Sequence, residues 1–168
     1  MAALPSLLRF RLNGRRFLVV HGSVEQTNSF MFESLDEAVF AEQIDLADAD
    51  AVIAGHTGIA FTRMIGDRAW HNCGALGMPA NDGTPRVWFS TLTSEGDAIR
   101  FAHHALVYDH SSAADKLRRV DLPPGYADGL ETGLWPSLDI LPPAEKAATG
   151  QPISLVDTVW QSALAQAI

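Results

Sequence analysis

The chain has 168 residues and carries 12 Lys plus Arg against 20 Asp plus Glu, a formal net charge of -8. This balance argues against general DNA or RNA binding, because contacts to phosphates need a basic surface. With 47% hydrophobic and 19% charged residues, the composition is typical of one globular domain and not of a disordered chain.

The same sequence predicts a location in the cytoplasm. No apolar run approaches the roughly 20 residues of a membrane span, so we expect no membrane partner. The first residues lack a basic segment followed by an apolar core, and we expect no secretory signal. The single cysteine, Cys73, has no internal partner for a disulfide, which fits a reducing compartment.

The first predicted elements form a β-hairpin. Alternation of apolar and polar residues predicts a strand over residues 7–12. Asn13-Gly14 is a strong signal for a tight turn, because both turn positions need a positive φ. The return strand, residues 16–20, is apolar on both faces and is therefore expected to be buried on both sides. It runs into His21-Gly22, and site residues tend to lie where a buried strand ends.

Alternating helix and strand signals follow. Ser34 or Asp36 is suited to cap a helix over residues 35–47. A short buried strand is predicted at 50–54 and ends in Gly55-His56-Thr57-Gly58. Further strands are predicted at 60–65, 68–72, 86–91 and 98–108, with a Gly- and Pro-rich loop over 73–85.

The C-terminal quarter is predicted to be helical. Ser111 is suited to cap a short helix that extends to Arg119, and prolines break the chain at 123–124 and 142–143. Apolar residues at helical spacing from Leu155 to Ala167 predict a terminal amphipathic helix. We therefore expect a single domain over residues 1–168, with a helical appendage over about 111–168 that packs on the strands.

Two histidines stand out by their positions. His21 and His56 each follow a buried strand and each has a neighbouring glycine. If the two strands are neighbours in one sheet, both imidazoles reach the same edge, where they could bind Zn, Fe or Mn. Two ligands alone make a weak metal site. The alternative is that both are half-buried histidines hydrogen-bonded to the backbone.

The remaining titratable candidates are weaker. His71 could join such a cluster, but on its own it is better interpreted as a cross-strand pairing residue. His103 and His104 point to opposite faces of a strand and cannot act together. His110 is expected at the surface. Cys73 has no basic partner nearby in the sequence, which argues against a nucleophile.

Three ordered segments resemble the C-terminal half of a calcineurin-like metallophosphoesterase. They are VVHGS at residues 19–23, AVIAGHT at 51–57 and HNCGALG at 71–77. The sequence RVWFS at 86–90 resembles the strand that follows the last loop of the family. The resemblance covers about residues 10–106, and three motifs in the family's order are more specific than any one of them.

The resemblance implies an α/β fold: a layered β-sandwich flanked by helices, incomplete relative to the family, with a two-metal site at the strand ends. His21 and His56 match ligands of the second metal. The implied activity is hydrolysis of a phosphomonoester or phosphodiester with divalent Mn, Fe or Zn as the cofactor, which this chain need not retain. Catalytic and substrate-binding residues are not assigned.

The sequence departs from the family at three points. The second residue after His56, a histidine in the family, is Gly58, which offers no ligand. No D-x-H or G-D motif precedes the histidines, because Gly66-Asp67 and Gly96-Asp97 follow them. No G-N-H supplies the family's proton-donating histidine. Neutral imidazoles alone compensate the repulsion between two close cations poorly.

Two hypotheses follow. The first is a metal-dependent phosphoester hydrolase, or a piece of one, that acts on a small phosphoester once an N-terminal segment completes the two-metal site. The second is a catalytically inactive binding or structural module that keeps the fold and forms a homo-oligomer, pairing through its open sheet edge. Neither hypothesis includes a nucleic-acid partner.

Overall fold

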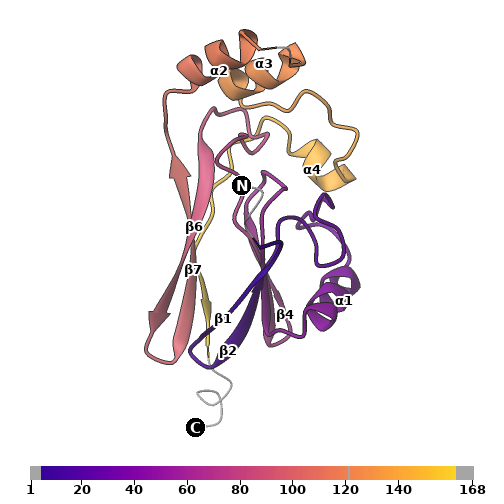
Figure 1. The fold of residues 1–168 in the computed structure, drawn as a ribbon, viewed down its shortest axis with the longest axis vertical. Coiled ribbons are helices and arrows are strands. Elements are labelled where there is room, and N and C mark those ends of the chain that lie inside the picture. Colours follow the sequence, from indigo (N-terminus) through magenta and orange to yellow (C-terminus); the bar gives the residue numbers. More distant parts are fainter. Residues whose placement is uncertain (1–4, 121, 162–168) are drawn as a thin grey trace.

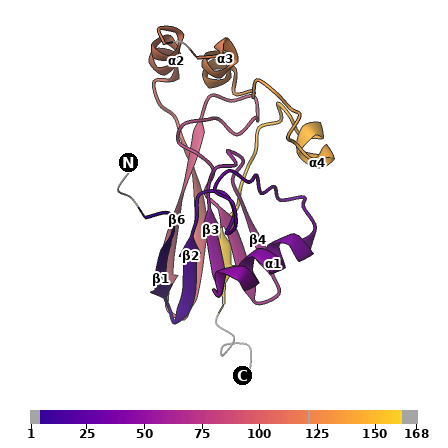
Figure 2. The same ribbon diagram turned by 45° about the vertical axis from the view of Figure 1, so that its right-hand side comes forward.

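The computed structural model describes residues 5–120 and 122–161. Helix α1 (Glu37–Ala47) lies on one face of a five-stranded sheet, and a three-stranded sheet covers the other face (Figures 1 and 2). The first sheet has the order β1-β2-β3-β5-β4, made of β1 (Leu8–Leu12), β2 (Arg15–Val19), β3 (Ala51–Ala54), β5 (Arg68–Asn72) and β4 (Phe61–Ile65). The second has the order β6-β7-β8, made of β6 (Val87–Glu95), β7 (Ala98–Leu106) and β8 (Thr158–Trp160). The predicted α/β class with layered sheets is confirmed.

The five-stranded sheet brings three parallel strands together at its centre. β2 pairs parallel with β3, and β3 pairs parallel with β5. Their carboxyl ends therefore meet at one edge of the sheet, the arrangement that the prediction for His21 and His56 requires. The predicted hairpin between β1 and β2 is confirmed, with φ of 48° at Asn13 and 76° at Gly14.

Alternation along the strands divides the apolar residues between two cores. Leu18, Val52 and Trp70 share a cluster with Phe40 and Ile44 of α1. The side chains of opposite parity pack between the two sheets, among them Phe17, Ile53, Ala69, Ile99, Phe101 and Trp160. Strand β3 is buried along its whole length, and Phe17 and Leu18 of β2 are buried on opposite faces, as the predicted apolar runs indicate.

The helices begin at polar or proline caps. Asp36, one of the two predicted caps, accepts a hydrogen bond from the amide of Ala38 at 2.9 Å and begins α1. The predicted Ser111 cap is wrong: Asp109 caps α2 (His110–Arg118) by accepting from the Ser112 amide at 3.1 Å. A carboxylate both accepts this bond and favours the positive helix N-terminus.

Two more helices follow, and each starts at a predicted proline break. α3 (Pro124–Thr132) packs beside α2 at one end of the molecule, and α4 (Pro143–Ala147) lies near that end (Figure 1). Proline at the first helical position loses no hydrogen bond, because that amide has no partner within the helix. Among the helices of the described residues, none is both long and apolar enough to cross a bilayer.

The predicted terminal helix is wrong where the structure describes it. Residues 158–160 form β8, which pairs antiparallel with β7 and places Trp160 opposite Ile99. Trp160 is buried against Phe17 and Phe101, and burial of this large ring between the sheets overrides the helical spacing of the segment. The segment from 111 onward is therefore helical only in part. The remainder of the predicted helix, residues 162–168, lies outside the described residues.

Candidate functional site

The site is built where three parallel strands end. The hydrogen-bonded ladder continues past the strands into the following segments: the amide of Val20 donates to Ile53 at 2.9 Å, and that of Gly55 donates to the carbonyl of His21 at 2.9 Å. The amide of Cys73 donates to Ala54 at 2.8 Å. The backbone that carries both site histidines is thus held as firmly as a strand.

The two predicted imidazoles meet. Nδ1 of His56 lies 3.1 Å from Nε2 of His21, with ring centroids 5.0 Å apart and the planes at 63°. His56 has a φ of 55°, in the left-handed region that non-glycine residues occupy at a cost of about 1 kcal/mol or more. Such local strain is typical of functional positions. The juxtaposition is therefore as predicted, and the role of the pair as metal ligands stays a prediction.

The spacing of the two nitrogens fits a single cation. Imidazole nitrogens bind zinc at about 2.0–2.1 Å, so two adjacent ones on one octahedral or tetrahedral ion lie about 2.8–3.4 Å apart. The observed 3.1 Å falls within that interval, and it is also the length of a hydrogen bond, which joins the two rings when one of the facing nitrogens carries a proton. Among residues 5–120 and 122–161, however, no group of three or more His, Cys, Asp or Glu side chains is placed to hold a metal ion. These residues supply half of a coordination shell.

The surroundings keep His56 neutral. Burial lowers its pKa and the nearby His21 lowers it further, while the backbone of Asn28 partly opposes both effects. A neutral imidazole keeps a lone pair, which is the form that binds a metal. Phe30 packs on the His56 ring with centroids 4.4 Å apart and supplies part of this burial.

Two positions hold the loops that carry the histidines. A side chain at Gly22 would approach the carbonyl oxygen of Thr27 to 2.6 Å, so only glycine permits the turn after His21. The side-chain amide of Asn72 donates to the carbonyls of Thr57 and Ile59, at 2.8 and 2.6 Å, and so fixes the loop after His56.

Gly58 stands where the resembled family has a further histidine ligand, and here it is a packing residue. A Cβ at this position would lie 3.2 Å from both Cζ2 of Trp135 and the carbonyl oxygen of Pro79. Trp135 is itself fixed, because its indole N–H donates to Pro79 at 2.7 Å and its amide donates to Asn81 at 2.9 Å. A side chain at position 58 would therefore have to displace the indole or the Pro79 carbonyl by a few tenths of an ångström.

Trp135 and Phe30 were not identified from the sequence as site residues. Trp135 follows α3, far along the chain from His56, and Phe30 lies in an irregular segment before α1. Neither carries a local signal, since an isolated aromatic residue is more often part of a core than of a site. Tertiary folding brings both residues to His56. The segment before α1 is held there by the Met31 amide, which donates to the Thr57 hydroxyl at 3.0 Å, and the segment after α3 packs on Gly58.

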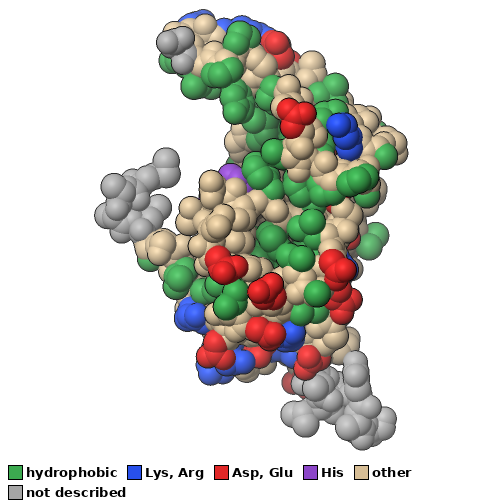
Figure 3. Space-filling view, turned by 90° about the vertical axis from the view of Figure 1, so that its right-hand side faces the viewer, with side chains coloured by type: hydrophobic (Ala, Val, Ile, Leu, Met, Phe, Trp, Pro, Cys, Tyr) green, Lys and Arg blue, Asp and Glu red, His purple; other side chains and the backbone are tan. Residues whose placement is uncertain are grey.

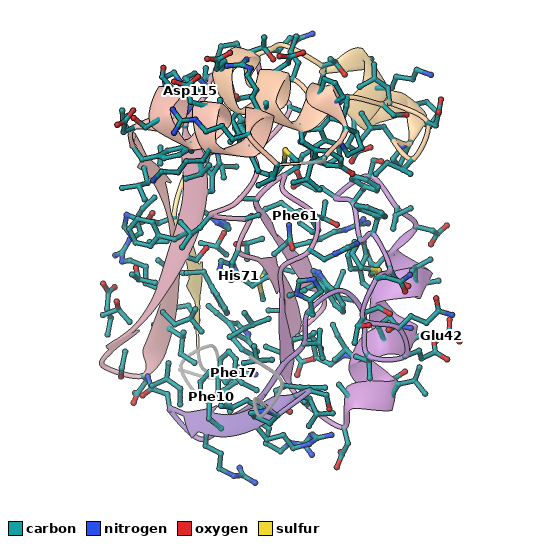
Figure 4. The ribbon with its side chains drawn as sticks, turned by 45° about the horizontal axis from the view of Figure 1, so that its top comes forward. Phe10, Phe17, Glu42, Phe61, His71 and Asp115 are labelled. Carbon is teal, nitrogen blue, oxygen red and sulfur yellow. The ribbon has the colours of Figure 1, made fainter. Side chains whose placement is uncertain are left out.

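The other histidines lie elsewhere. His71 does not join the pair at the strand ends: its side chain lies between the two sheets (Figure 4) and bonds to Thr62, which is opposite to it in register. It is a cross-strand pairing residue. His103 faces His71, whereas His104 packs on Phe89 on the other face of β7, as strand alternation predicts.

His110 and Cys73 gain no support as site residues. His110 is the first residue of α2 and packs against Tyr108. Burial raises the pKa of the Cys73 thiol, against a smaller opposing effect of the Ser90 hydroxyl. The thiolate is the nucleophilic form, so this burial disfavours the chemistry.

His71 and His103 lie between the two sheets and are called the inner pair; hydroxyl groups join them in a chain of hydrogen bonds. The Thr62 hydroxyl lies 2.7 Å from Nδ1 of His71 and 2.9 Å from Nε2 of His103, and the Ser90 hydroxyl lies 2.9 Å from Nδ1 of His103. With Nδ1 of both rings protonated, His71 donates to Thr62, Thr62 donates to His103, and His103 donates to Ser90. In this chain Nε2 of His103 accepts from Thr62, which requires the His103 ring to be neutral.

Comparison with known proteins establishes the fold and no more. No protein-family model matches the chain, and no curated protein matches it. The hypothetical protein PH1004 from Pyrococcus horikoshii OT3 superposes with a TM-score of 0.66 at 14% identity, over 79% of this chain and 52% of that chain. A metallophosphoesterase from Sphaerobacter thermophilus superposes with a TM-score of 0.64 at 19% identity, over 79% of this chain and 61% of that chain.

This chain therefore shares the α/β fold of these two structures and spans about half to three fifths of their length. Vps29 from Entamoeba histolytica, in complex with zinc, is more distant, with a TM-score of 0.49 at 20% identity over 65% of this chain and 58% of that chain.

Proposed function

We propose that this chain supplies the histidine half of a metal-dependent phosphoester hydrolase site. His21 and His56 hold one divalent cation, and carboxylate ligands come from another segment or another chain. The observation that carries the proposal is the 3.1 Å approach of two imidazole nitrogens at the carboxyl ends of adjacent parallel strands. The similarity to a metallophosphoesterase structure supports the choice of chemistry.

The two histidines are suited to hold one cation, but not to complete its coordination. Imidazole suits Zn, Fe and Mn, and a cation held there supplies positive charge that stabilises phosphoryl oxygens. His56 is fixed by its loop and kept neutral by burial, so it presents a ready lone pair. Gly58 has no side chain to offer as a ligand, and a larger residue at that position would press on Trp135 and the Pro79 carbonyl. Alone, the chain is expected to be a poor hydrolase or an inactive one.

A second candidate is a catalytically inactive module that keeps the fold and associates with copies of itself. The packing of Trp135 against Gly58 favours it, because the position of a histidine ligand in the resembled family is here a glycine that packs against an indole. Phe89 and Val159, on the outer strands of the three-stranded sheet, are 37% and 40% exposed and offer apolar surface for association. A monomer by light scattering at micromolar concentration would count against this candidate.

Metal binding and hydrolysis test the proposal together. Zinc binding is measured by calorimetry, and hydrolysis of a chromogenic phosphodiester is followed with added manganese. His56→Ala should weaken zinc binding about 100-fold or more, because it removes one of two ligands. His104→Ala, on the outer face of β7, is the matched control and should leave binding unchanged.

The outcomes separate the two candidates. Zinc binding that depends on His56, with weak or absent hydrolysis that rises when a carboxylate-bearing partner segment is added, supports the histidine half-site. No binding by the wild-type chain, or binding that survives His56→Ala, contradicts it.

A further inference from the structure

An apolar cavity adjoins the His21–His56 pair. It has a volume of about 320 Å³, and His56 and Gly58 form part of its wall. The rest of the wall comes from the segment before α1, from the loop between β5 and β6, from α3 and from the segment that follows α3. The main side chains that line it are Phe30, Met78, Tyr126, Trp135 and Ile140. Figure 3 shows hydrophobic side chains gathered over the upper part of one face, whereas acidic ones gather over the lower part.

The polarity of this cavity restricts what it can hold. No Lys, Arg, Asp or Glu is among the described side chains that line it. The one indole N–H, of Trp135, already donates to Pro79 at 2.7 Å, so the ring offers its carbon surface. The hydroxyl of Ser137 likewise donates to Asp139 at 2.9 Å. The polar groups that remain in the lining are the His56 ring and the Tyr126 hydroxyl, both uncharged in kind, so a charged group entering the cavity would lose its hydration without meeting an opposite charge.

The size and the shape of the wall suit a flat ring. An apolar cavity of about 150 Å³ already accepts benzene in another protein, so 320 Å³ leaves room for a ring with substituents. Phe30, Tyr126 and Ile140 are 36%, 43% and 46% exposed, so the cavity opens to solvent beside large apolar side chains. Aromatic groups pack well against such walls, edge to face or offset.

We propose that the site takes a phosphoester with an uncharged aromatic leaving group, whose ring enters the cavity walled by Phe30, Tyr126 and Trp135. The position of the phosphoryl group, next to His21 and His56, rests on the proposed function. The cavity itself does not: apart from His56, which belongs to both, its wall is made of residues that take no part in the proposed cation site.

A binding experiment tests this without any turnover. Amide resonances of the full chain are followed by NMR during titration with three probes: phenol, phenylphosphonate and methylphosphonate, the last two with one equivalent of zinc. Phenol should shift the amides of Gly58, Met78 and Ser137. Phenylphosphonate should bind about tenfold more tightly than methylphosphonate, a difference typical of a group that fills an apolar pocket.

Two variants locate the effect. Phe30→Ala removes part of the cavity wall and should reduce the preference for phenylphosphonate several-fold. Phe89→Ala is the matched control, because Phe89 is 37% exposed against 36% for Phe30 but lies on β6 and does not line the cavity. It should leave the preference unchanged.

Failure of the inference and failure of the proposed function give different results. Equal affinity for the two phosphonates, or phenol shifts confined to other regions, overturns the aromatic pocket. Phenol shifts at Gly58 and Met78 without any zinc-dependent phosphonate binding keep the pocket and overturn the half-site. A preference that survives Phe30→Ala, with shifts elsewhere, also overturns the pocket.

Discussion

The two histidine pairs of this protein are built from the same side chain and arranged in opposite ways. At the strand ends, His21 and His56 approach nitrogen to nitrogen at 3.1 Å. Between the sheets, His71 and His103 stack with centroids 4.5 Å apart and are joined through Thr62. In the inner pair, hydroxyl groups of the strands already bond three of the four ring nitrogens. In the outer pair, one nitrogen of each ring faces that of the other ring.

The comparison shows that burial and neighbouring hydroxyl groups determine whether a histidine pair is available to bind a ligand. Burial lowers the pKa of His71 to about 3, and the nearby His103 adds to this effect. His56 is less buried and its pKa is lowered by the same two causes. His56 of the outer pair lines a cavity, whereas the rings of the inner pair are bonded to strand hydroxyls, so the outer pair is the one suited to a ligand.

Of the stability predictions, the introduction of a histidine at position 58 should have the largest effect. Gly58→His introduces a side chain against Trp135 and the carbonyl of Pro79, each 3.2 Å from the new Cβ. We expect a loss of about 3 kcal/mol in the free energy of unfolding, measured by urea titration. Gly77→His is the control, because a Cβ there meets nothing within 4 Å. Equal effects of both substitutions would show that Trp135 does not press on a side chain at position 58.

Acid should destabilise the protein through the inner pair. Burial lowers the folded-state pKa of His71 to about 3 and that of His103 to about 4, from 6.5. His104 lowers the pKa of His103 further, and Asp157 opposes this. The unfolded chain therefore binds more protons below pH 6.5, and stability falls as the pH drops from there toward 4 and 3. From pH 7 to pH 5, His71 alone should cost about 2 kcal/mol.

Denaturant titrations at several pH values measure this slope. His71→Gln should remove the contribution of His71, because glutamine does not titrate. His104→Gln, on the outer face of β7, should keep most of the slope. A His71→Gln variant with an unchanged pH dependence would contradict the account of the inner pair.

Removing the bridging hydroxyl should have the smallest effect of the three. Thr62→Val keeps the shape of the side chain but leaves His71 and His103 without their shared partner. We expect a loss of about 1.5 kcal/mol in the free energy of unfolding. Thr91→Val is the matched control, since Thr91 bonds His104 at an exposed position on the outer face. A similar loss of stability in both variants would mean that the Thr62 hydroxyl between His71 and His103 contributes no more than an exposed hydrogen bond.

Local signals in the sequence predicted the frame of the site. The Asn13-Gly14 turn, the doubly buried strands and the histidines that follow them are short-range features, and each was found where predicted. The meeting of His21 with His56 followed from one further assumption, that their strands are neighbours in a parallel sheet.

Long-range packing accounts for what the sequence did not predict. The sequence around Gly58 does not predict that Trp135 packs against it, because the contact depends on how the segment after α3 folds back. Trp160 has helical spacing with its neighbours, yet burial against Phe17 draws it into a strand. The aromatic wall of the cavity is assembled in the same way, from segments far apart in the chain.

X-ray absorption at the zinc edge, with one equivalent of zinc on the full chain, tests the central claim most directly. The account predicts two imidazole nitrogens at about 2.0–2.1 Å from the metal, and one in His21→Ala. Zinc bound without imidazole scattering, or an unchanged spectrum in His21→Ala, would show that these two rings do not share a cation.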